Sequence, residues 1–319
     1  MNANSSDFKH QSVRDLAWAV LSPPLVSQMS QSCVWPNAKW YQDVYEESLL
    51  WLLELDSNPS ELERLLEGQK DRRLGKYFET LWFYWFSNNP RYEMVGNNLQ
   101  IIVDGETLGE IDFIVLDKVT DKLVHWEVAV KFYLGLGDMR KMCNWHGPNY
   151  RDRLDIKVDH LQQRQSMLSK DPRVEGWLRQ KGLSVDQCAV VLKGRLYYPW
   201  HGLPEKVAQK VSQLKESDFL KSVRAPVHSS PEHLRSWWFK ESEFTDEFSD
   251  EQRFSPLVKQ GWLEKIPTIL ETNYFTKSDI FKTISDYELR LPLQVQMKNP
   301  CYSWDRVFIV GDNWPDDIT

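Results

Sequence analysis

The stretch HWEVAVKFYL, residues 125–134, is the part of the chain from which its fold is best inferred. Side chains on a strand point alternately to two faces. The even positions here are all apolar, which predicts a core face, whereas the odd positions carry His125, Glu127 and Lys131 around a small alanine. The simplest interpretation is an antiparallel strand whose second face meets water. The polar odd face therefore raises the question of what it contacts.

The preceding stretch GEIDFIVLD, residues 109–117, has the same design and carries Asp112 in its middle, where aspartate is disfavoured. A short turn joins it to the next strand, so we expect the two strands to pair and Asp112 to lie beside Glu127. Two carboxylates at ~5 Å repel by about 3 kcal/mol at an effective dielectric constant of 20. A shared proton, a nearby cation or a divalent metal must offset that repulsion.

Two further charged residues belong to the same hypothesis. Glu79 lies in GKYFETLWF, a predicted aromatic helix, and a glutamate in such a setting is rarely buried without a partner. Lys131 shares the face of Glu127 and could neutralise a carboxylate or polarise a water. An alternative is that Glu127 and Lys131 form a structural ion pair and nothing more.

A basic helix is predicted at RDRLDIKVDHLQQRQSML, residues 151–168. Regular helical spacing would place Lys157, His160 and Arg164 on one face, with Gln163 nearby. Between positions 140 and 164 the chain has six lysines and arginines against three aspartates, a local excess of positive charge. Such a surface would suit a phosphate backbone. The alternative is an ordinary solvated helix face.

The order of elements predicts a mixed α/β core. Three strands are expected near 91–103, 109–117 and 123–134, preceded by the aromatic helix and followed by the basic helix and a further strand, DQCAVVLKGRLYYP. Another helix is expected at 204–223, and RVFIV near the end is a strand. We therefore divide the chain into an N-terminal helical segment (1–70), the core (71–200) and a C-terminal extension (201–319).

Composition narrows the class of protein. The 319 residues are 41% hydrophobic and 27% charged, which is ordinary for a globular protein. No apolar run approaches the ~20 residues that span a bilayer, and the N-terminus lacks the features of a signal peptide, so we expect a soluble cytoplasmic protein without membrane partners. The net charge of −7 argues against a wholly basic nucleic-acid binder but leaves room for a local basic surface.

Other familiar sites are not indicated. The four cysteines are far apart and form no CxxC pair, so we expect reduced thiols and neither a zinc site nor a disulfide framework. No phosphate-binding glycine loop, GxSxG or HExxH motif occurs. The Trp-rich stretches SWWFK and GWLEKI could stack bases, although with 15 tryptophans in the chain ordinary packing is the better explanation.

The sequence resembles a known family in several stretches. VRDLAWAVLSPPL, LGKYFETLWFYW, GEIDFIV, HWEVAVKFYL and GPNYRDRLDIKVDHLQQRQ look like DUF1853, a family of bacterial proteins placed within the PD-(D/E)XK nuclease superfamily. The resemblance spans most of residues 13–200 and is weaker beyond. It implies a restriction-endonuclease-like mixed β-sheet, here with the N-terminal helical segment and a Trp-rich α+β extension.

The resemblance also implies roles for the charged residues. Asp112 and Glu127 would be ligands of Mg²⁺ or Mn²⁺, and Glu79 would match the acid that many members carry on the core helix. Lys131 would stand for the signature lysine, although the superfamily pattern places that lysine two residues after the acid, where this chain has Ala129.

The implied activity is metal-dependent hydrolysis of phosphodiester bonds in DNA or RNA. The residues expected to contact the nucleic acid or the waters of the metal are Lys157, His160, Gln163 and Arg164. The alternative is a nuclease fold with a degenerate site that acts as a nucleic-acid-binding or protein-interaction module. Retention of metal binding separates the two.

Overall fold

The computed structural model describes residues 8–27, 29, 32–200, 225–264, 274–286, 288–298 and 306–316. The helix expected at 204–223 lies outside the described residues. Contacts divide the chain into two compact units: the first comprises residues 1–131, 156–194 and 230–232, and the second comprises residues 132–155, 195–229 and 233–319. Two strands, β3 and β5, contribute residues to both units.

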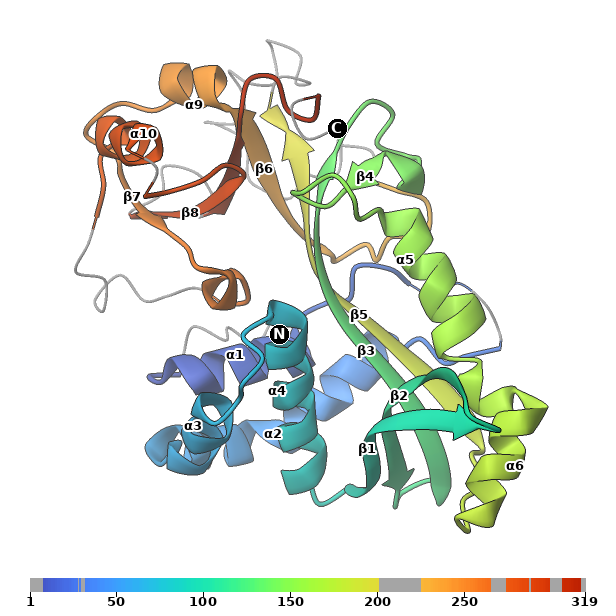
Figure 1. Ribbon diagram of the computed structural model, residues 1–319. Helices are drawn as coiled ribbons and strands as arrows, with labels where there is room; N and C mark the ends of the chain where they lie inside the picture. The colour runs from blue at the N-terminus through green and yellow to red at the C-terminus, as the bar shows by residue number, and fades with distance from the viewer. Residues whose placement is uncertain are drawn as a thin grey trace. The chain divides into compact units, whose positions relative to one another are not determined.

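The first unit begins with helices, as the sequence predicts (Figure 1). They are α1 (Gln11–Leu21), α2 (Ala38–Ser57), α3 (Ser60–Glu67) and α4 (Leu74–Asn88). The strands that come next are β1 (Tyr92–Val103), β2 (Glu106–Asp117), β3 (Lys122–Gly135) and, later in the chain, β5 (Gln187–Pro199). Between β3 and β5 come α5 (Leu154–His160), a π-helical turn η3 (Leu161–Gln165), η4 (Leu168–Lys170) and α6 (Pro172–Gln180).

The strands of the first unit lie in the order β1-β2-β3-β5. Both predicted hairpins are confirmed, since β1 pairs antiparallel with β2 and β2 with β3. The β1–β2 turn places Asp104 at φ 51° and Gly105 at φ 82°, the left-handed conformations that Asp-Gly turns favour. Between β3 and β5 the backbones approach so closely that a Cβ at Gly194 would overlap the backbone oxygen of Lys131, so only glycine fits there.

The even face of β3 packs into an aromatic core. Trp126 stacks on Trp82 of α4 at 6.2 Å between ring centroids and also meets Phe86 and Trp40. The predicted core face is therefore confirmed. It explains why α4 is so rich in aromatic residues, because large rings bury the most apolar area per side chain.

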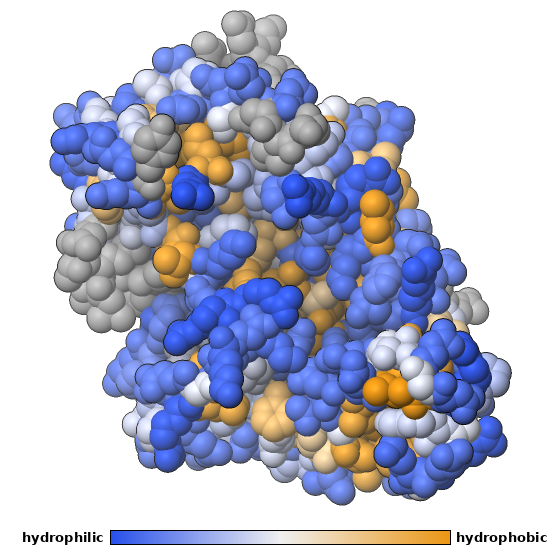
Figure 2. All heavy atoms as spheres, in the orientation of Figure 1, coloured by the Kyte–Doolittle hydropathy of each residue, from blue (hydrophilic) through white to orange (hydrophobic). Residues whose placement is uncertain are grey.

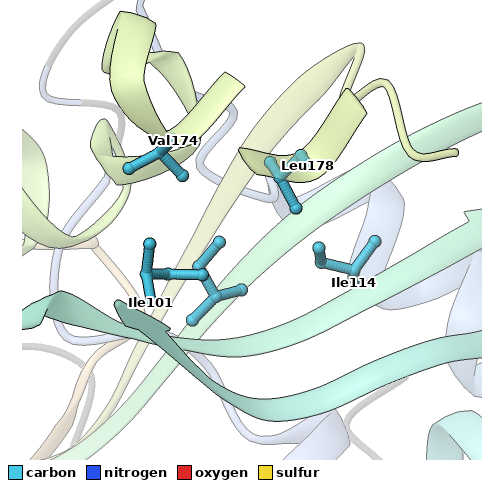
Figure 3. Packing of buried hydrophobic residues seen from close by; sticks show 5 residues of the cluster. Ile101, Ile114, Val174 and Leu178 are labelled. Atoms are coloured by element: carbon cyan, nitrogen blue, oxygen red, sulfur yellow. The ribbon is translucent and has the colours of Figure 1, made fainter. Parts of the chain in front are cut away.

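The opposite face of the sheet carries a second apolar cluster. Ile101, Ile111 and Ile114 of β1 and β2 pack against Val174 and Leu178 of α6, and all five are essentially inaccessible (Figure 3). Because Ile114 pairs with His125 in the β2–β3 register, this is the face to which the odd positions of β3 point. The sheet of this unit is thus covered by helices on both faces.

The cysteine prediction is wrong for two of the four residues. Cys33 and Cys188 are joined by a disulfide, with their Cα atoms 5.0 Å apart. An isolated parallel bridge between Val34 and Ala189 holds the segment before α2 against β5 and brings the two thiols together. A separation of 155 residues hides this proximity from sequence spacing. Cys143 is free.

The second unit continues the strand order as β5-β6-β9-β8-β7. Its remaining elements are β4 (Trp145–His146), β6 (Leu234–Lys240), α9 (Glu241–Glu247), β7 (Arg253–Pro256), α10 (Lys277–Ser285), β8 (Leu293–Lys298) and β9 (Arg306–Val310). Strand β6 is parallel to β5 and β9, whereas β8 is antiparallel to β9 and β7. The strand predicted at RVFIV is confirmed, and Trp237 and Trp238 of SWWFK are buried in packing.

The observed class is a mixed α/β protein with a large mixed sheet, as predicted at that level. Among the described residues, no helix is long and apolar enough to cross a bilayer. Hydrophilic side chains predominate on the face shown in Figure 2, with hydrophobic ones in separate spots.

Candidate functional site

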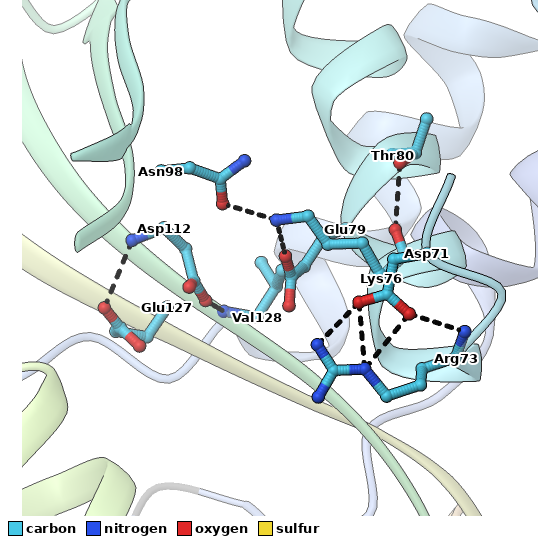
Figure 4. A network of polar contacts seen from close by, with 9 residues as sticks. All are labelled: Asp71, Arg73, Lys76, Glu79, Thr80, Asn98, Asp112, Glu127 and Val128. Atoms are coloured by element: carbon cyan, nitrogen blue, oxygen red, sulfur yellow. Dashed lines mark hydrogen bonds and ion pairs between the residues drawn. The ribbon is translucent and has the colours of Figure 1, made fainter. Parts of the chain in front are cut away.

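The β2–β3 hairpin brings Asp112 and Glu127 together. Its regular backbone register ends at the pair Phe113–Trp126, one position before these two residues. Beyond that pair each carboxylate reaches the backbone of the opposite strand: Asp112 Oδ2 accepts from the Val128 amide at 3.0 Å, and Glu127 Oε1 lies 3.5 Å from the Asp112 amide (Figure 4). The two acids therefore lie close together, as predicted. At this point of the hairpin the backbone amides of Val128 and Asp112 face side-chain carboxylates of the opposite strand instead of backbone carbonyls.

The odd face of β3 is closed to water, so the simplest interpretation of this strand is wrong at these positions. His125 and Glu127 are both 0% exposed. Glu127 Oε1 and His125 Nε2 share a hydrogen bond of 2.9 Å, and His125 Nδ1 lies 2.9 Å from the Ser169 hydroxyl. Burial lowers the pKa of His125 to about 4, so the imidazole is neutral at pH 7 and donates through one nitrogen while accepting through the other.

Gln165 completes the contacts of Glu127. Its amide nitrogen donates to Glu127 Oε2 at 2.8 Å, and its amide oxygen accepts from Lys157 at 3.0 Å and lies 2.9 Å from His160 Nδ1. Both predicted residues of α5, Lys157 and His160, are thus connected to Glu127 through one amide. The structural ion pair with Lys131 is replaced by contacts to His125 and Gln165.

The helix that carries these residues is irregular. Instead of one helix over 151–168, α5 ends at His160 and a π-helical turn comes next, in which the Ser166 amide donates to Leu161. A π turn inserts one extra residue. Gln165 therefore takes the position that Arg164 would have in a regular helix, and both Arg164 and Gln163 are exposed.

Glu79 approaches the pair from α4. Its carboxylate accepts a hydrogen bond of 2.7 Å from the Lys76 ammonium, and Lys76 also donates to the side-chain oxygen of Asn98 at 2.9 Å. About a quarter of the Glu79 side chain is exposed. Its charge raises the pKa values of both Asp112 and Glu127, so the three predicted acids share one electrostatic environment.

The two central carboxyls are held in an environment that disfavours their charged forms. Burial, together with the charge of Glu127, raises the pKa of Asp112 to about 8. Burial likewise raises the pKa of Glu127 to about 8, against the opposing effects of the Asp112 amide and Lys157. In the part of the chain that the structure describes, neither acid forms an ion pair with lysine or arginine. A shared proton or an added cation would relieve the strain.

Lys131 lies on the same strand face but farther along β3. Four residues separate it from Glu127, or about 13 Å in an extended strand. It is partly buried, and the charges that most affect the two central pKa values include Lys157 and Glu79 but not Lys131.

Sequence reasoning left three members of this network without a role. His125 had a usable signal, since it shares the face of Glu127 and is only two residues away. Gln165 had none, because its position depends on the π turn. Ser169 could not be inferred either, since it joins the network from the 3-10 turn η4.

The donor set fits a divalent cation in part. No three histidine, cysteine, aspartate or glutamate side chains converge as a metal centre within the described ranges. Mg²⁺, however, is commonly held by one or two carboxylates, several waters and substrate phosphate. The buried carboxyl of Glu127 and the partly buried carboxyl of Asp112, both of raised pKa, match that kind of incomplete protein site.

Comparison with known protein families gives one match. Residues 14–310 match the domain of unknown function DUF1853. The chain belongs to this family. The DUF1853 match covers every residue of the site and extends through β9, well beyond residues 13–200. No curated protein and no solved structure matches the chain.

Proposed function

We propose that this DUF1853 chain is a metal-dependent nuclease that hydrolyses phosphodiester bonds in DNA or RNA. The observation that carries it is the carboxylate pair on β2 and β3. Asp112 and Glu127 each point to the opposite strand, with pKa values of about 8 and no lysine or arginine ion pair in the described part of the chain. A natural protein retains such a destabilised pair where function requires it.

The order of elements supports a restriction-endonuclease-like core. A helix with Glu79 precedes a strand with Asp112 and a strand with Glu127, and α5, α6 and β5 come after them. This is the arrangement that membership of the PD-(D/E)XK superfamily would require. The topology of that superfamily is part of the proposal.

Asp112 and Glu127 would hold Mg²⁺ or Mn²⁺, with Glu79 beside them. The bound cation would supply charge stabilisation at the phosphate and a more acidic water. Its charge would also lower the pKa of each carboxyl, so that both acids become ionised at neutral pH. His125 and Gln165 fix the two oxygens of Glu127 by hydrogen bonds, as supporting residues do around metal ligands.

The phosphate backbone of the nucleic acid would contact α5 and the π-helical turn η3. Lys157 and His160 are connected to Glu127 through Gln165, and Gln163 and Arg164 are exposed on the next turn. Lysine and arginine supply most contacts to phosphates. We therefore propose a nucleic-acid partner on this side of the first unit.

A second function has one specific observation in its favour. Both oxygens of Glu127 are already engaged, by His125 and by Gln165, which is the pattern of a structural carboxyl group. The alternative is a degenerate nuclease fold that binds nucleic acid or a protein without cleaving. Such a protein would bind no divalent cation at this pair.

The test is a cleavage screen with the full-length chain. Supercoiled plasmid, single-stranded DNA, single-stranded RNA and double-stranded RNA are incubated with Mg²⁺, with Mn²⁺ or with EDTA. We expect cleavage of at least one substrate that EDTA and the variant Glu127→Gln both abolish. Cleavage that persists in Glu127→Gln would contradict the assigned site, and binding of nucleic acid without cleavage would favour the degenerate module.

A further inference from the structure

Lys157 is a cation that hydrogen bonds connect to one of the two central acids, Glu127. Its ammonium donates to the Gln165 amide oxygen at 3.0 Å, and the nitrogen of the same amide donates to Glu127 Oε2 at 2.8 Å. A single side chain thus links the lysine to the carboxylate.

Lys131 is less well placed for the same task. It shares the strand face of Glu127, but it is about 13 Å farther along β3. Lys157 of α5 is therefore a second candidate for the catalytic lysine, beside Lys131 of β3.

The local irregularity of the helix explains how this second candidate is held. In a regular helix Arg164, seven positions after Lys157, would lie on the same face as Lys157, but here Arg164 is exposed. The π turn over 161–165 shifts the phase by one residue and presents Gln165, whose amide can donate to a carboxylate and accept from an ammonium at once. Arginine offers no acceptor, so it could not make both contacts.

We propose that Lys157, rather than Lys131, is the catalytic lysine of this site and that Gln165 is its positioning residue. Lys157 has this role only if the proposed nuclease function holds. Its ammonium would contact a non-bridging oxygen of the scissile phosphate and stabilise the charge that develops there.

The reaction leaves Lys157 unchanged. A water oxygen forms a bond to phosphorus while one phosphorus–oxygen ester bond breaks. One water proton ends on the leaving oxygen, which becomes a hydroxyl, and the other stays with the new phosphate monoester or passes to solvent. Lys157 keeps its proton throughout and contributes charge alone.

The first test compares Lys157→Met with Lys131→Met on the substrate that the parent cleaves. Methionine keeps much of the apolar stem of lysine and removes the charge. We expect Lys157→Met to lower kcat/KM about 100-fold, as loss of one transition-state donor does elsewhere, and Lys131→Met to retain far more activity. Near-parental cleavage by Lys157→Met, with loss in Lys131→Met, would overturn the assignment while leaving the nuclease function intact.

A second readout does not depend on cleavage. Mn²⁺ is titrated calorimetrically into the parent and both variants without substrate. At a pH above 8, where both carboxyls are largely ionised, removing a nearby positive charge should tighten Mn²⁺ binding about threefold in Lys157→Met and leave it unchanged in Lys131→Met. The reverse pattern would overturn the inference even if no substrate is found. A parent that binds no Mn²⁺ and cleaves nothing would remove the site on which both proposals rest.

Gln165 is tested by Gln165→Met, which can make neither contact. A positioning residue does not touch the substrate, so we expect kcat to fall about tenfold and KM to change less than twofold. A rise in KM with unchanged kcat would mean that Gln165 contacts the substrate instead. Unchanged kcat and KM would show that Lys157 needs no positioning by this amide.

Discussion

Strand β2 carries two aspartates in opposite situations. Asp117, at the end of β2, accepts two hydrogen bonds of 3.1 and 2.8 Å from the Arg91 guanidinium. Burial alone would raise the pKa of Asp117, but Arg91 keeps that pKa below its ordinary value. Asp112 faces Glu127 instead, and its pKa is raised to about 8. The same side chain on one strand is thus a stable charged group at one position and a disfavoured one at the other.

The difference is that, among the described residues, one aspartate has a complete ion pair and the other has none. The Asp117 pair supplies its own cation and needs nothing more. The Asp112 pair lacks a lysine or arginine ion pair in the described part of the chain, and in the proposed function a bound cation would supply the missing positive charge. Stability sacrificed at a particular place is typical of a functional site.

The largest expected effect is on cleavage. Asp112→Asn and Asp117→Asn make the same chemical change at the two aspartates of β2. We expect Asp112→Asn to lower the rate about 100-fold or more, because it removes a proposed metal ligand, and Asp117→Asn to stay within about threefold of the parent. Initial rates on the cleaved substrate give both values. Equal losses in the two variants would erase the distinction.

The next effect is on the pH dependence of stability. Carboxyls whose pKa is raised by folding bind protons more tightly in the folded state, so their contribution is full below about pH 4 and is lost as the pH rises to about 8. We expect the free energy of unfolding, measured by urea without divalent cations, to fall by a few kcal/mol between pH 5 and pH 8, at about 1.4 kcal/mol per pKa unit. The fall should be steepest above about pH 6.5, because below it His125, whose pKa is lowered to about 4, has the opposite effect.

Glu127→Gln provides the control for that dependence. It removes one of the two titrating groups, so the fall between pH 5 and pH 8 should become shallower. Asp117 has the opposite sign: its contribution is present at neutral pH and is lost only as the pH falls through its lowered pKa. A parent and a Glu127→Gln variant with equal slopes would contradict the raised pKa of the acid pair.

A smaller effect is expected from breaking the Arg91–Asp117 pair. Arg91→Met removes both hydrogen bonds and leaves the mostly buried Asp117 carboxylate without its cation. We expect the free energy of unfolding at pH 7 to fall by about 2 kcal/mol, the usual cost for hydrogen bonds to a charged group. Urea denaturation measures it. Unchanged stability would mean that Asp117 is as replaceable as an exposed surface charge.

The smallest effect concerns the support of Glu127. Ser169→Ala removes the hydroxyl that contacts the buried His125 Nδ1 and leaves that nitrogen unsatisfied. We expect a loss of about 1 kcal/mol in unfolding free energy. Ser166, also buried but bonded to the backbone of its own helix through Oγ, gives the matched control Ser166→Ala with a smaller loss. Equal losses would show that the His125 contact adds nothing specific.

Periodicity and short connections in the sequence predict the local arrangement of the site. The alternation in 125–134 indicates the two faces of β3, and a short turn was enough to predict that Asp112 lies near Glu127, because pairing of neighbouring strands is the common outcome. The expectation that the odd face meets water failed because helices cover both faces of this sheet, and alternation alone cannot show a second cover.

The features that could not be predicted depend on tertiary contacts or on backbone irregularity. The π turn, which places Gln165 rather than Arg164 beside Lys157, has no sequence signature. Regular helical spacing therefore predicted Arg164, wrongly, as the residue next to Lys157. The Cys33–Cys188 disulfide joins segments that meet only in the folded chain. Parallel pairing of β6 with β5 and β9 is likewise a long-range choice that local pattern does not encode.

The central claim is that the Asp112–Glu127 pair binds a divalent cation. Calorimetric titration of Mn²⁺ and Mg²⁺ into the purified full-length chain, beside Asp112→Ala, Glu127→Ala and the control Asp117→Ala, tests it most directly. The predicted result is saturable binding in the parent and in Asp117→Ala that disappears in the two site variants while they remain folded by circular dichroism. Binding that survives in both site variants, or its absence from the parent, would contradict the claim.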